Sequence, residues 1–95
     1  MITITFEADK NRSVAHQESA EIGECTFLHN DDLWVINHTL VDEAYQGQGI
    51  ARQLVDKVAS EARKAGKKLA ATCPYAIGLF ERTNDYDAVS YTHLR

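Results

Sequence analysis

The feature that most constrains the fold of this chain is a strand–helix–strand run in residues 33–73. Residues 33–41 are apolar at nearly every position and rich in β-branched types, which predicts a central strand buried on both faces. Apolar residues recur at helical spacing from about residue 49 to 65, and residues 68–73 predict a second strand. Because such crossovers are right-handed and join parallel strands, this run predicts one βαβ unit.

The residues that follow the helix and the second strand predict where each ends. Gly66 stands where a left-handed helix cap is needed, and Pro74 ends the second strand because proline cannot donate to a ladder. A shorter final helix is expected over about residues 75–83, with its apolar side chains buried.

The chain before the βαβ unit predicts antiparallel strands. Residues 2–6 alternate apolar and polar, which is typical of a half-buried strand. A further strand is expected at residues 22–28, where alternation places Ile22 and Cys25 on opposite faces. Residues 30–32 then predict a hairpin turn. The expected fold class is therefore α/β (α+β), with antiparallel strands that lead into a βαβ unit and a final short helix.

Length and composition indicate one small globular domain. The chain has 95 residues, of which 44% are hydrophobic and 25% charged, so collagen-like, low-complexity and disordered chains are excluded. Residues 1–89 are expected to form a single domain. Residues 90–95 are either a native terminus or a non-native tail, and they are left out of the site.

The expected location is the cytoplasm. No apolar stretch approaches the ~20 residues of a membrane span, and the N-terminus lacks the pattern of a signal peptide, so no membrane partner is expected. Two cysteines are too few for a secreted disulfide scaffold, which favours a reducing compartment. The oligomeric state stays open between a monomer and a weak dimer.

The charge is distributed unevenly along the chain. A net charge of −4 argues against a nucleic-acid partner, because such proteins usually carry a basic surplus. Residues 1–48 hold nine acids and two bases, a net of −7, whereas residues 49–95 hold eight bases and five acids, a net of +3. Solvated surface charge is one interpretation. The other is that the second half binds an anion and the first half meets a cationic partner.

The loop between the central strand and the helix contains the clearest ligand signal. Gly47 and Gly49 precede the helix, where glycine lets the backbone approach a ligand closely. The unpaired amides of a first helical turn favour an anion, and Arg52 adds a cation nearby. These residues predict a pyrophosphate-binding loop beyond the carboxyl ends of the strands.

Two common phosphate motifs do not fit this loop. The Walker A pattern needs Lys-Ser/Thr after its second glycine, where the chain has Ile50 and Ala51. The dinucleotide pattern needs a third glycine, and the chain has Arg52 in that place.

The run Gln-Gly-Gln-Gly-Ile-Ala at residues 46–51 instead resembles the coenzyme A pyrophosphate motif of the GNAT N-acetyltransferase superfamily, Gln/Arg-x-x-Gly-x-Gly/Ala. His38-Thr39-x-Val41 precedes this run, and Cys73-Pro74-Tyr75 follows it. Together these segments are similar to the small single-domain GNAT-like acetyltransferases, and the resemblance covers about residues 2–89.

The resemblance implies an enzyme that takes an acetyl group from acetyl-CoA and passes it to an amine, such as a protein lysine, a peptide or a small amine. It implies coenzyme A between two splayed parallel strands, with the pantetheine arm against the backbone near Leu40 and Val41. The residues expected at the cofactor are Leu40, Val41, Gln46, Gly47, Gln48, Gly49, Ile50, Ala51, Arg52, Cys73, Pro74 and Tyr75. The N-terminal helical segment that shapes the acceptor site in full-length members is not found here, so the resemblance does not name the acceptor. The acidic first half favours a cationic one.

Cys73 is the first candidate catalytic residue. It ends a strand at the sheet edge that carries the glycine loop, so a thiolate there could accept the acetyl group. The alternative is a cysteine that only lines the pocket, because free cysteine is among the most buried residue types. The resemblance, in which this Cys-Pro-aromatic triplet is a proposed active-site feature, brings the two interpretations into balance.

His38 is the second candidate catalytic residue. Alternation places it on the face of Trp34 and Ile36, as either a core histidine or a base that deprotonates Cys73 or the incoming ammonium. The glutamate that the superfamily often uses is absent from this strand. Tyr75 is either an acid for the departing thiolate or a core aromatic residue.

Two further functions stay open beside the enzyme. One is a coenzyme A-binding module without catalysis, and the other is an adaptor whose acidic half, with Glu18, Glu21 and Glu24, meets a basic partner. No metal is expected, because Cys25 and His29 are only two ligands on one strand face.

Overall fold

A computed structural model of the chain describes residues 1–83 and 85–86. The strands form one sheet in the order β1-β2-β3-β4-β5, antiparallel up to β4 and parallel between β4 and β5. The predicted fold class is therefore confirmed, whereas the predicted domain end at residue 89 and the tail 90–95 lie outside the described residues. The elements are β1 (Ile2–Glu7), η1 (Ala8–Lys10), β2 (Arg12–Gln17), β3 (Ala20–Asn30), β4 (Leu33–Val41), η2 (Glu43–Tyr45), α1 (Ile50–Lys64), β5 (Lys68–Ala71) and α2 (Pro74–Arg82).

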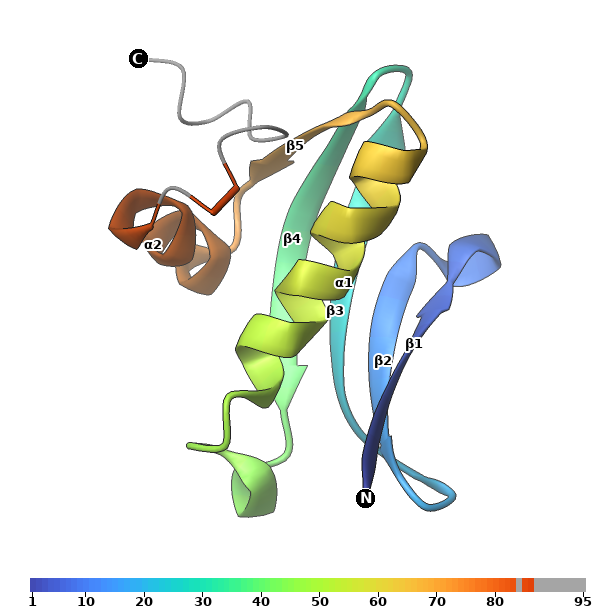
Figure 1. The fold of residues 1–95 in the computed structure, drawn as a ribbon, viewed down its shortest axis with the longest axis vertical. Helices are drawn as coiled ribbons and strands as arrows, with labels where there is room; N and C mark the ends of the chain where they lie inside the picture. Colours follow the sequence, from blue (N-terminus) through green and yellow to red (C-terminus); the bar gives the residue numbers. More distant parts are fainter. Residues whose placement is uncertain (84, 87–95) are drawn as a thin grey trace.

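Both long helices pack against one face of the sheet. Figure 1 shows α1 lying across the strands, all five of which it contacts, and α2 beside β5. Neither α1 nor α2 covers the opposite face, where Leu28 and Leu40 are each 54% exposed. The prediction that residues 33–41 are buried on both faces is therefore wrong, because half of this apolar run has no helix over it. No helix in the described part of the chain is long and apolar enough to cross a membrane.

A β-bulge in β4 changes which side chains face α1. Asn37 is an extra residue with no partner on β3, because Ile36 and His38 are opposite successive residues of that strand. An extra residue moves every following side chain to the other face. The prediction that His38 shares the buried face of Trp34 is therefore wrong, because His38 is exposed. Thr39 takes the core-facing position instead.

A second irregularity lies between β2 and β3. Ala15 and His16 of β2 are opposite the residues on either side of Ile22, which has no partner of its own. Ile22 is 3% exposed and belongs to the same core cluster as Cys25. The prediction that these two side chains point to opposite faces is wrong, because regular alternation does not hold across the bulge.

Helix α1 joins the sheet through one apolar face and through two close approaches. The Ser13 hydroxyl, which is fully buried, donates a hydrogen bond to the carbonyl of Leu54 at 2.8 Å. A Cβ atom on Gly23 would lie 2.9 Å from the carbonyl oxygen of Leu40 and 3.3 Å from Cδ1 of Leu54, so only glycine fits between the sheet and α1 there. The buried side chains of the helix are Ile50, Leu54, Val55, Val58, Ala59 and Ala62.

The end of α1 follows from the residue expected to stop it, whereas β5 ends before Pro74, which instead begins α2. Gly66 adopts the predicted left-handed conformation with φ of +72°, and the amide of Lys67 closes the end of α1 on Ala62. Strand β5 ends at Ala71, before the predicted limit. Helix α2 has Pro74 in its first turn, where a proline costs no hydrogen bond.

Candidate active site

Strands β4 and β5 pair as far as Ile36 and then separate, and we call the opening between them the fork. The carbonyl of Ile36 accepts hydrogen bonds from the amides of both Thr72, at 2.9 Å, and Cys73, at 3.2 Å, before the chain turns into α2. The two strands pair only through residues 33–36 of β4, so residues 37–41 leave a strand edge that β5 does not cover.

The free edge of β4 presents the backbone of Thr39 and Val41. The amide of Asp42 donates to Ile22 of β3 at 2.7 Å, so the backbone groups of Val41 point the other way. Leu40, two places before Asp42, points its backbone toward β3. Of the two residues expected to pair with a pantetheine arm, Val41 is therefore at the free edge and Leu40 is not.

Gln46 crosses from the loop to this edge. Its side-chain amide Nε2 donates to the carbonyl of Val41 at 3.2 Å. The motif glutamine therefore braces the loop against β4, which places the following glycines at the mouth of the fork.

The glycine loop ends in a helix terminus without a side-chain cap. Gly47 has φ of +84° and Gly49 has φ of +78°, so both need the left-handed conformation that glycine adopts at little cost. Gly49 is the N-cap of α1 and has no side chain to cap it, and the first helical bond runs from Gln53 to Gly49. The amides of residues 50–52 thus have no partner within the helix and point at an anion site.

A cleft of about 440 Å³ lies between this loop and the fork. Eight of the predicted cofactor residues line it, namely Val41, Gln46, Gly47, Gly49, Ile50, Ala51, Arg52 and Tyr75. Thr39 and Tyr45 also line it and were not predicted, although Thr39 belongs to the segment that carried the resemblance. The remaining predicted residues, Leu40, Gln48, Cys73 and Pro74, do not line the cleft directly.

Cys73 lies at the inner end of the fork, directly behind Thr39 and Tyr75 of the cleft wall. It is 6% exposed and forms the N-cap of α2. Burial acts to raise the pKa of its thiol, but hydrogen bonds from the amides of Ala76, Tyr75 and Thr39, and one with the Thr39 hydroxyl, bring that pKa below its ordinary value. Three amides and a hydroxyl around one sulfur suit a thiolate, as expected of a reactive cysteine at a helix N-terminus.

Cys25 is the second free thiol near the fork, and its environment is the opposite. It lies on β3 and is fully buried. Burial raises the pKa of this thiol to about 12, although a hydrogen bond with Thr39 acts in the other direction. Cys25 therefore remains a protonated thiol while Cys73 can ionise.

The structure does not bring the second candidate catalytic residue to Cys73. His38 is exposed on the sheet face opposite to Thr39, because neighbouring residues of a strand point to opposite faces. Tyr75, in contrast, lines the cleft two residues after Cys73, and burial raises the pKa of its phenol, so it remains protonated.

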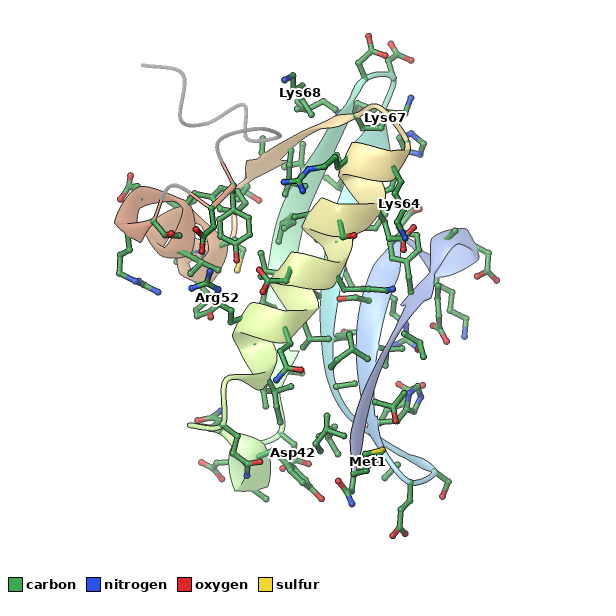
Figure 2. All side chains as sticks on the ribbon, in the orientation of Figure 1. Met1, Asp42, Arg52, Lys64, Lys67 and Lys68 are labelled. Carbon is green, nitrogen blue, oxygen red and sulfur yellow. The ribbon has the colours of Figure 1, made fainter. Side chains whose placement is uncertain are left out.

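The Arg52 guanidinium already contacts two carboxylates and an aromatic ring of the chain. Its Nη2 pairs with Asp85 at 2.5 Å, its Nε lies 3.8 Å from Asp56, and its guanidinium stands 5.7 Å from the centroid of the Tyr86 ring. Tyr86 also donates a hydrogen bond to Asp56. In Figure 2 the Arg52 side chain points from α1 toward α2.

Three of the lysines of the second half lie far from the loop. Figure 2 shows Lys64, Lys67 and Lys68 at one end of the molecule and Asp42, beside the loop, at the other. Helix α1, which spans roughly 22 Å at 1.5 Å per residue, separates them. The basic surplus of this half therefore does not gather at the anion site, where Arg52 is the one cation lining the cleft among the described residues.

No metal site accompanies the cleft in the described residues, since no three His, Cys, Asp or Glu side chains gather there. Cys25 points into the core, whereas the ring of His29 is exposed and packs edge-on against Trp34 at 5.6 Å. The elements that remain are a braced glycine loop, an uncapped helix, a free strand edge and a thiolate site. They define a small α/β protein whose cleft is suited to an anionic ligand beside a cysteine.

Comparison with known families identifies the family to which this protein belongs. The sequence profile of a GCN5-related N-acetyltransferase family matches residues 6–89, and the chain belongs to this family. It is therefore an acyltransferase of the acetyl-CoA-dependent type, as the sequence motif indicated. A search of curated proteins finds no match.

Solved structures agree with this assignment. A GCN5-like protein from Staphylococcus aureus, determined by NMR, is 26% identical with a TM-score of 0.74, over 93% of this chain and 86% of that one. A GNAT family N-acetyltransferase from Escherichia coli in complex with CoA is 28% identical with a TM-score of 0.58, over 63% of this chain and 38% of that one. The ribosomal-protein-S18-alanine N-acetyltransferase of Escherichia coli shares the fold, with 24% identity and a TM-score of 0.65 over 75% of this chain and 49% of that one. The chain thus spans less than half the length of both Escherichia coli proteins.

Proposed function

We propose that this enzyme binds acetyl-CoA in the cleft at the fork and transfers the acetyl group to a cationic amine through Cys73. The observation that carries the proposal is the position of the Cys73 sulfur, which lies directly behind the cleft wall among three backbone amide donors and the Thr39 hydroxyl. A core cysteine that only packed would need no such set of donors.

The residues of the cleft fit the cosubstrate. The free amides of residues 50–52 suit a pyrophosphate, and the open space around Gly47 and Gly49, where an added Cβ would meet no atom within 4 Å, leaves room for it. The free edge at Thr39 and Val41 offers backbone groups to the amides of the pantetheine arm. The structure of a CoA complex for the Escherichia coli relative supports the same ligand here.

The proposed chemistry has two steps. The Cys73 thiolate attacks the thioester carbonyl carbon, the new C–Sγ bond forms, and the bond to the sulfur of coenzyme A breaks as that thiolate leaves. The cationic acceptor first loses a proton to solvent, and the resulting neutral amine attacks the acetyl-cysteine. The N–C bond forms, the bond to Sγ breaks, the nitrogen loses a second proton to solvent, and Cys73 is again a thiolate.

Two cleft residues assist the departure of coenzyme A. Tyr75 lines the cleft near Cys73 and keeps its phenol protonated, so it can donate a proton to the leaving thiolate. The amide of Thr39 donates to the Cys73 sulfur, so it is near any acyl group bound to that sulfur, and a backbone amide is suited to stabilise the charge that develops on the attacked oxygen.

The acceptor is proposed to be cationic because acidic residues stand beside the cleft. Asp42 and Glu43 are exposed between two residues of its lining, Val41 and Tyr45. A lysine side chain or a polyamine would approach this rim favourably.

The acidic residues of the first three strands support an adaptor less well. Glu7, Glu21 and Glu24 all accept hydrogen bonds from Arg12, at 2.6, 3.0 and 2.9 Å. The Arg12 guanidinium lowers the pKa of Glu21, which keeps that carboxylate ionised and paired. Much of the acidic charge is thus balanced within the fold.

The test measures binding and acetyl transfer separately. Wild-type enzyme mixed with acetyl-CoA should gain the mass of one acetyl group on Cys73, and Cys73→Ala should lose that adduct and most of its turnover on polyamines and lysine peptides. Calorimetry should show that Cys73→Ala still binds coenzyme A. Undiminished turnover in Cys73→Ala would indicate direct transfer, and coenzyme A binding without any transfer by the wild type would favour the non-catalytic module.

We also propose that residues 1–89 form one domain that works in the cytoplasm. The match of the family profile to residues 6–89 and the free state of both cysteines support this. Fractionation of tagged protein from its cells, with labelling of free thiols, tests the location.

A further inference from the structure

We propose that Thr39 is a positioning residue for Cys73, and that its hydroxyl hydrogen bond changes direction when Cys73 ionises, with Cys25 completing the chain. The inference deepens the proposed function, since it concerns how the fold prepares the nucleophile. It rests on three side chains that adjacent strands and the start of α2 bring together.

The Thr39 hydroxyl lies between the two thiols. Its Oγ1 is 3.6 Å from the sulfur of Cys25 and 3.6 Å from the sulfur of Cys73. These distances are within the range of hydrogen bonds to sulfur, and both thiols are buried. The bulge at Asn37 is what turns Thr39 inward, because regular alternation would place His38 there.

One hydroxyl hydrogen can serve only one sulfur at a time. When Cys73 is a thiol, its S–H donates to Thr39, and the Thr39 O–H donates to Cys25, which is the pattern in the structure. When Cys73 is a thiolate it can only accept, so the Thr39 O–H turns toward it. Cys25 then donates its own S–H to the oxygen of Thr39.

This reversal requires Cys25 to keep its proton. Burial raises the pKa of Cys25 to about 12, so it remains an S–H donor throughout the neutral range. The proton of Cys73 leaves the chain, Thr39 and Cys25 retain theirs, and only the direction of the two hydrogen bonds changes. Both states of Cys73 therefore have a satisfied network without moving any backbone.

A disulfide is excluded as the reason for placing two cysteines here. Cys25 on β3 is opposite Thr39 of β4, and Cys73 lies beyond β4 on the side of β5. Neighbouring strands are about 4.8 Å apart, so the two Cα atoms are separated by roughly twice that distance. A disulfide needs Cα atoms closer than about 7 Å.

The test compares Thr39→Val, which keeps the shape and removes the hydroxyl, with Thr39→Ser, which keeps the hydroxyl. The readout is the pH dependence of Cys73 alkylation by iodoacetamide, followed by mass mapping. The other titratable groups facing Cys73, namely Cys25 and Tyr75, both have raised pKa values, so the midpoint reports on Cys73. Thr39→Val should raise the midpoint by about one pH unit, and Thr39→Ser should stay near the wild type.

A structural role alone would not produce this pattern. Coenzyme A affinity and the urea midpoint identify variants that fold poorly, and Thr39→Ala compared with Thr39→Ser repeats the test if valine does not fit. An unchanged alkylation midpoint in both variants without the hydroxyl would overturn the inference. A raised midpoint together with full turnover in Cys73→Ala would uphold the role of Thr39 and reject Cys73 as the nucleophile.

Discussion

The guanidinium of Arg52 is paired with the carboxylate of Asp85, although the same side chain lines the cleft where an anion is expected. The pair joins the start of α1 to the segment after α2. The hydrogen bond with Asp85 is the main reason that the pKa of Arg52 is raised. A pyrophosphate and Asp85 would thus compete for one cation.

Replacement of Asp85 should tighten the binding of coenzyme A. In Asp85→Asn the guanidinium no longer has a carboxylate partner there, so Arg52 is free to turn toward the ligand. Because exposed ion pairs are weak, we expect the gain in affinity to reach at most about fivefold. Calorimetry measures it, with Asp31→Asn in the β3–β4 turn as the control. Weaker binding in Asp85→Asn would mean that the pair orders the site instead.

Replacement of Gly49 by alanine should affect both stability and ligand binding. The left-handed φ of +78° costs an alanine about 1–2 kcal/mol, and the added Cβ would occupy space beside the free amides of α1. We expect a loss of coenzyme A affinity of about tenfold.

Gly66→Ala is the matched control for Gly49→Ala. Gly66 has a similar φ of +72° and equally open surroundings, but it lies at the other end of α1. Urea unfolding should show a similar loss of stability for both variants, and calorimetry should show normal affinity for Gly66→Ala alone. Equal affinities for the two variants would contradict the assignment of the loop.

The two thiols should differ sharply in reactivity. The pKa of Cys73 is lowered, so this thiol ionises more readily than an ordinary cysteine, whereas the Cys25 thiol, with a pKa of about 12, is almost fully protonated near pH 8. Iodoacetamide should therefore modify Cys73 at least about a hundredfold faster, and coenzyme A should protect it. Mass mapping of peptides over time measures both rates, and preferential labelling of Cys25 would contradict the assigned environments.

The lowered pKa of Cys73 also predicts how stability depends on pH. A thiol that ionises more readily when folded stabilises the folded state once the pH exceeds its folded pKa, and this contribution is complete above the unfolded value. It is lost as the pH falls. Cys73→Ser should therefore remove part of the gain in the urea midpoint between about pH 7 and 9. A pH dependence identical to that of the wild type would show that the thiolate is not stabilised by folding.

His38→Ala should leave the pH midpoint of Cys73 alkylation unchanged. His38 is exposed on the other face of the sheet, so its charge is screened from the thiol by solvent and by the strand itself. The measurement is the same alkylation profile, compared with that of Thr39→Val. A rise in the midpoint similar to that of Thr39→Val would restore His38 as the base for Cys73.

The sequence by itself determined the βαβ unit, the glycine loop and the place of Cys73 beside it. Each of these depends on local signals: helical periodicity, two glycines that need positive φ, and a proline that follows the second strand. Such signals act between residues that are close along the chain, so they can be recognised without knowing the fold.

Only the tertiary structure decided which side chains meet at the fork. Strand alternation has a period of two, so the single extra residue Asn37 exchanges His38 for Thr39 at the thiol. A bulge is a property of the pairing between β3 and β4, and no residue of β4 marks it in isolation. The partner of Arg52 is also decided by the tertiary structure. It is Asp85, 33 residues away, because α2 returns the chain to the start of α1.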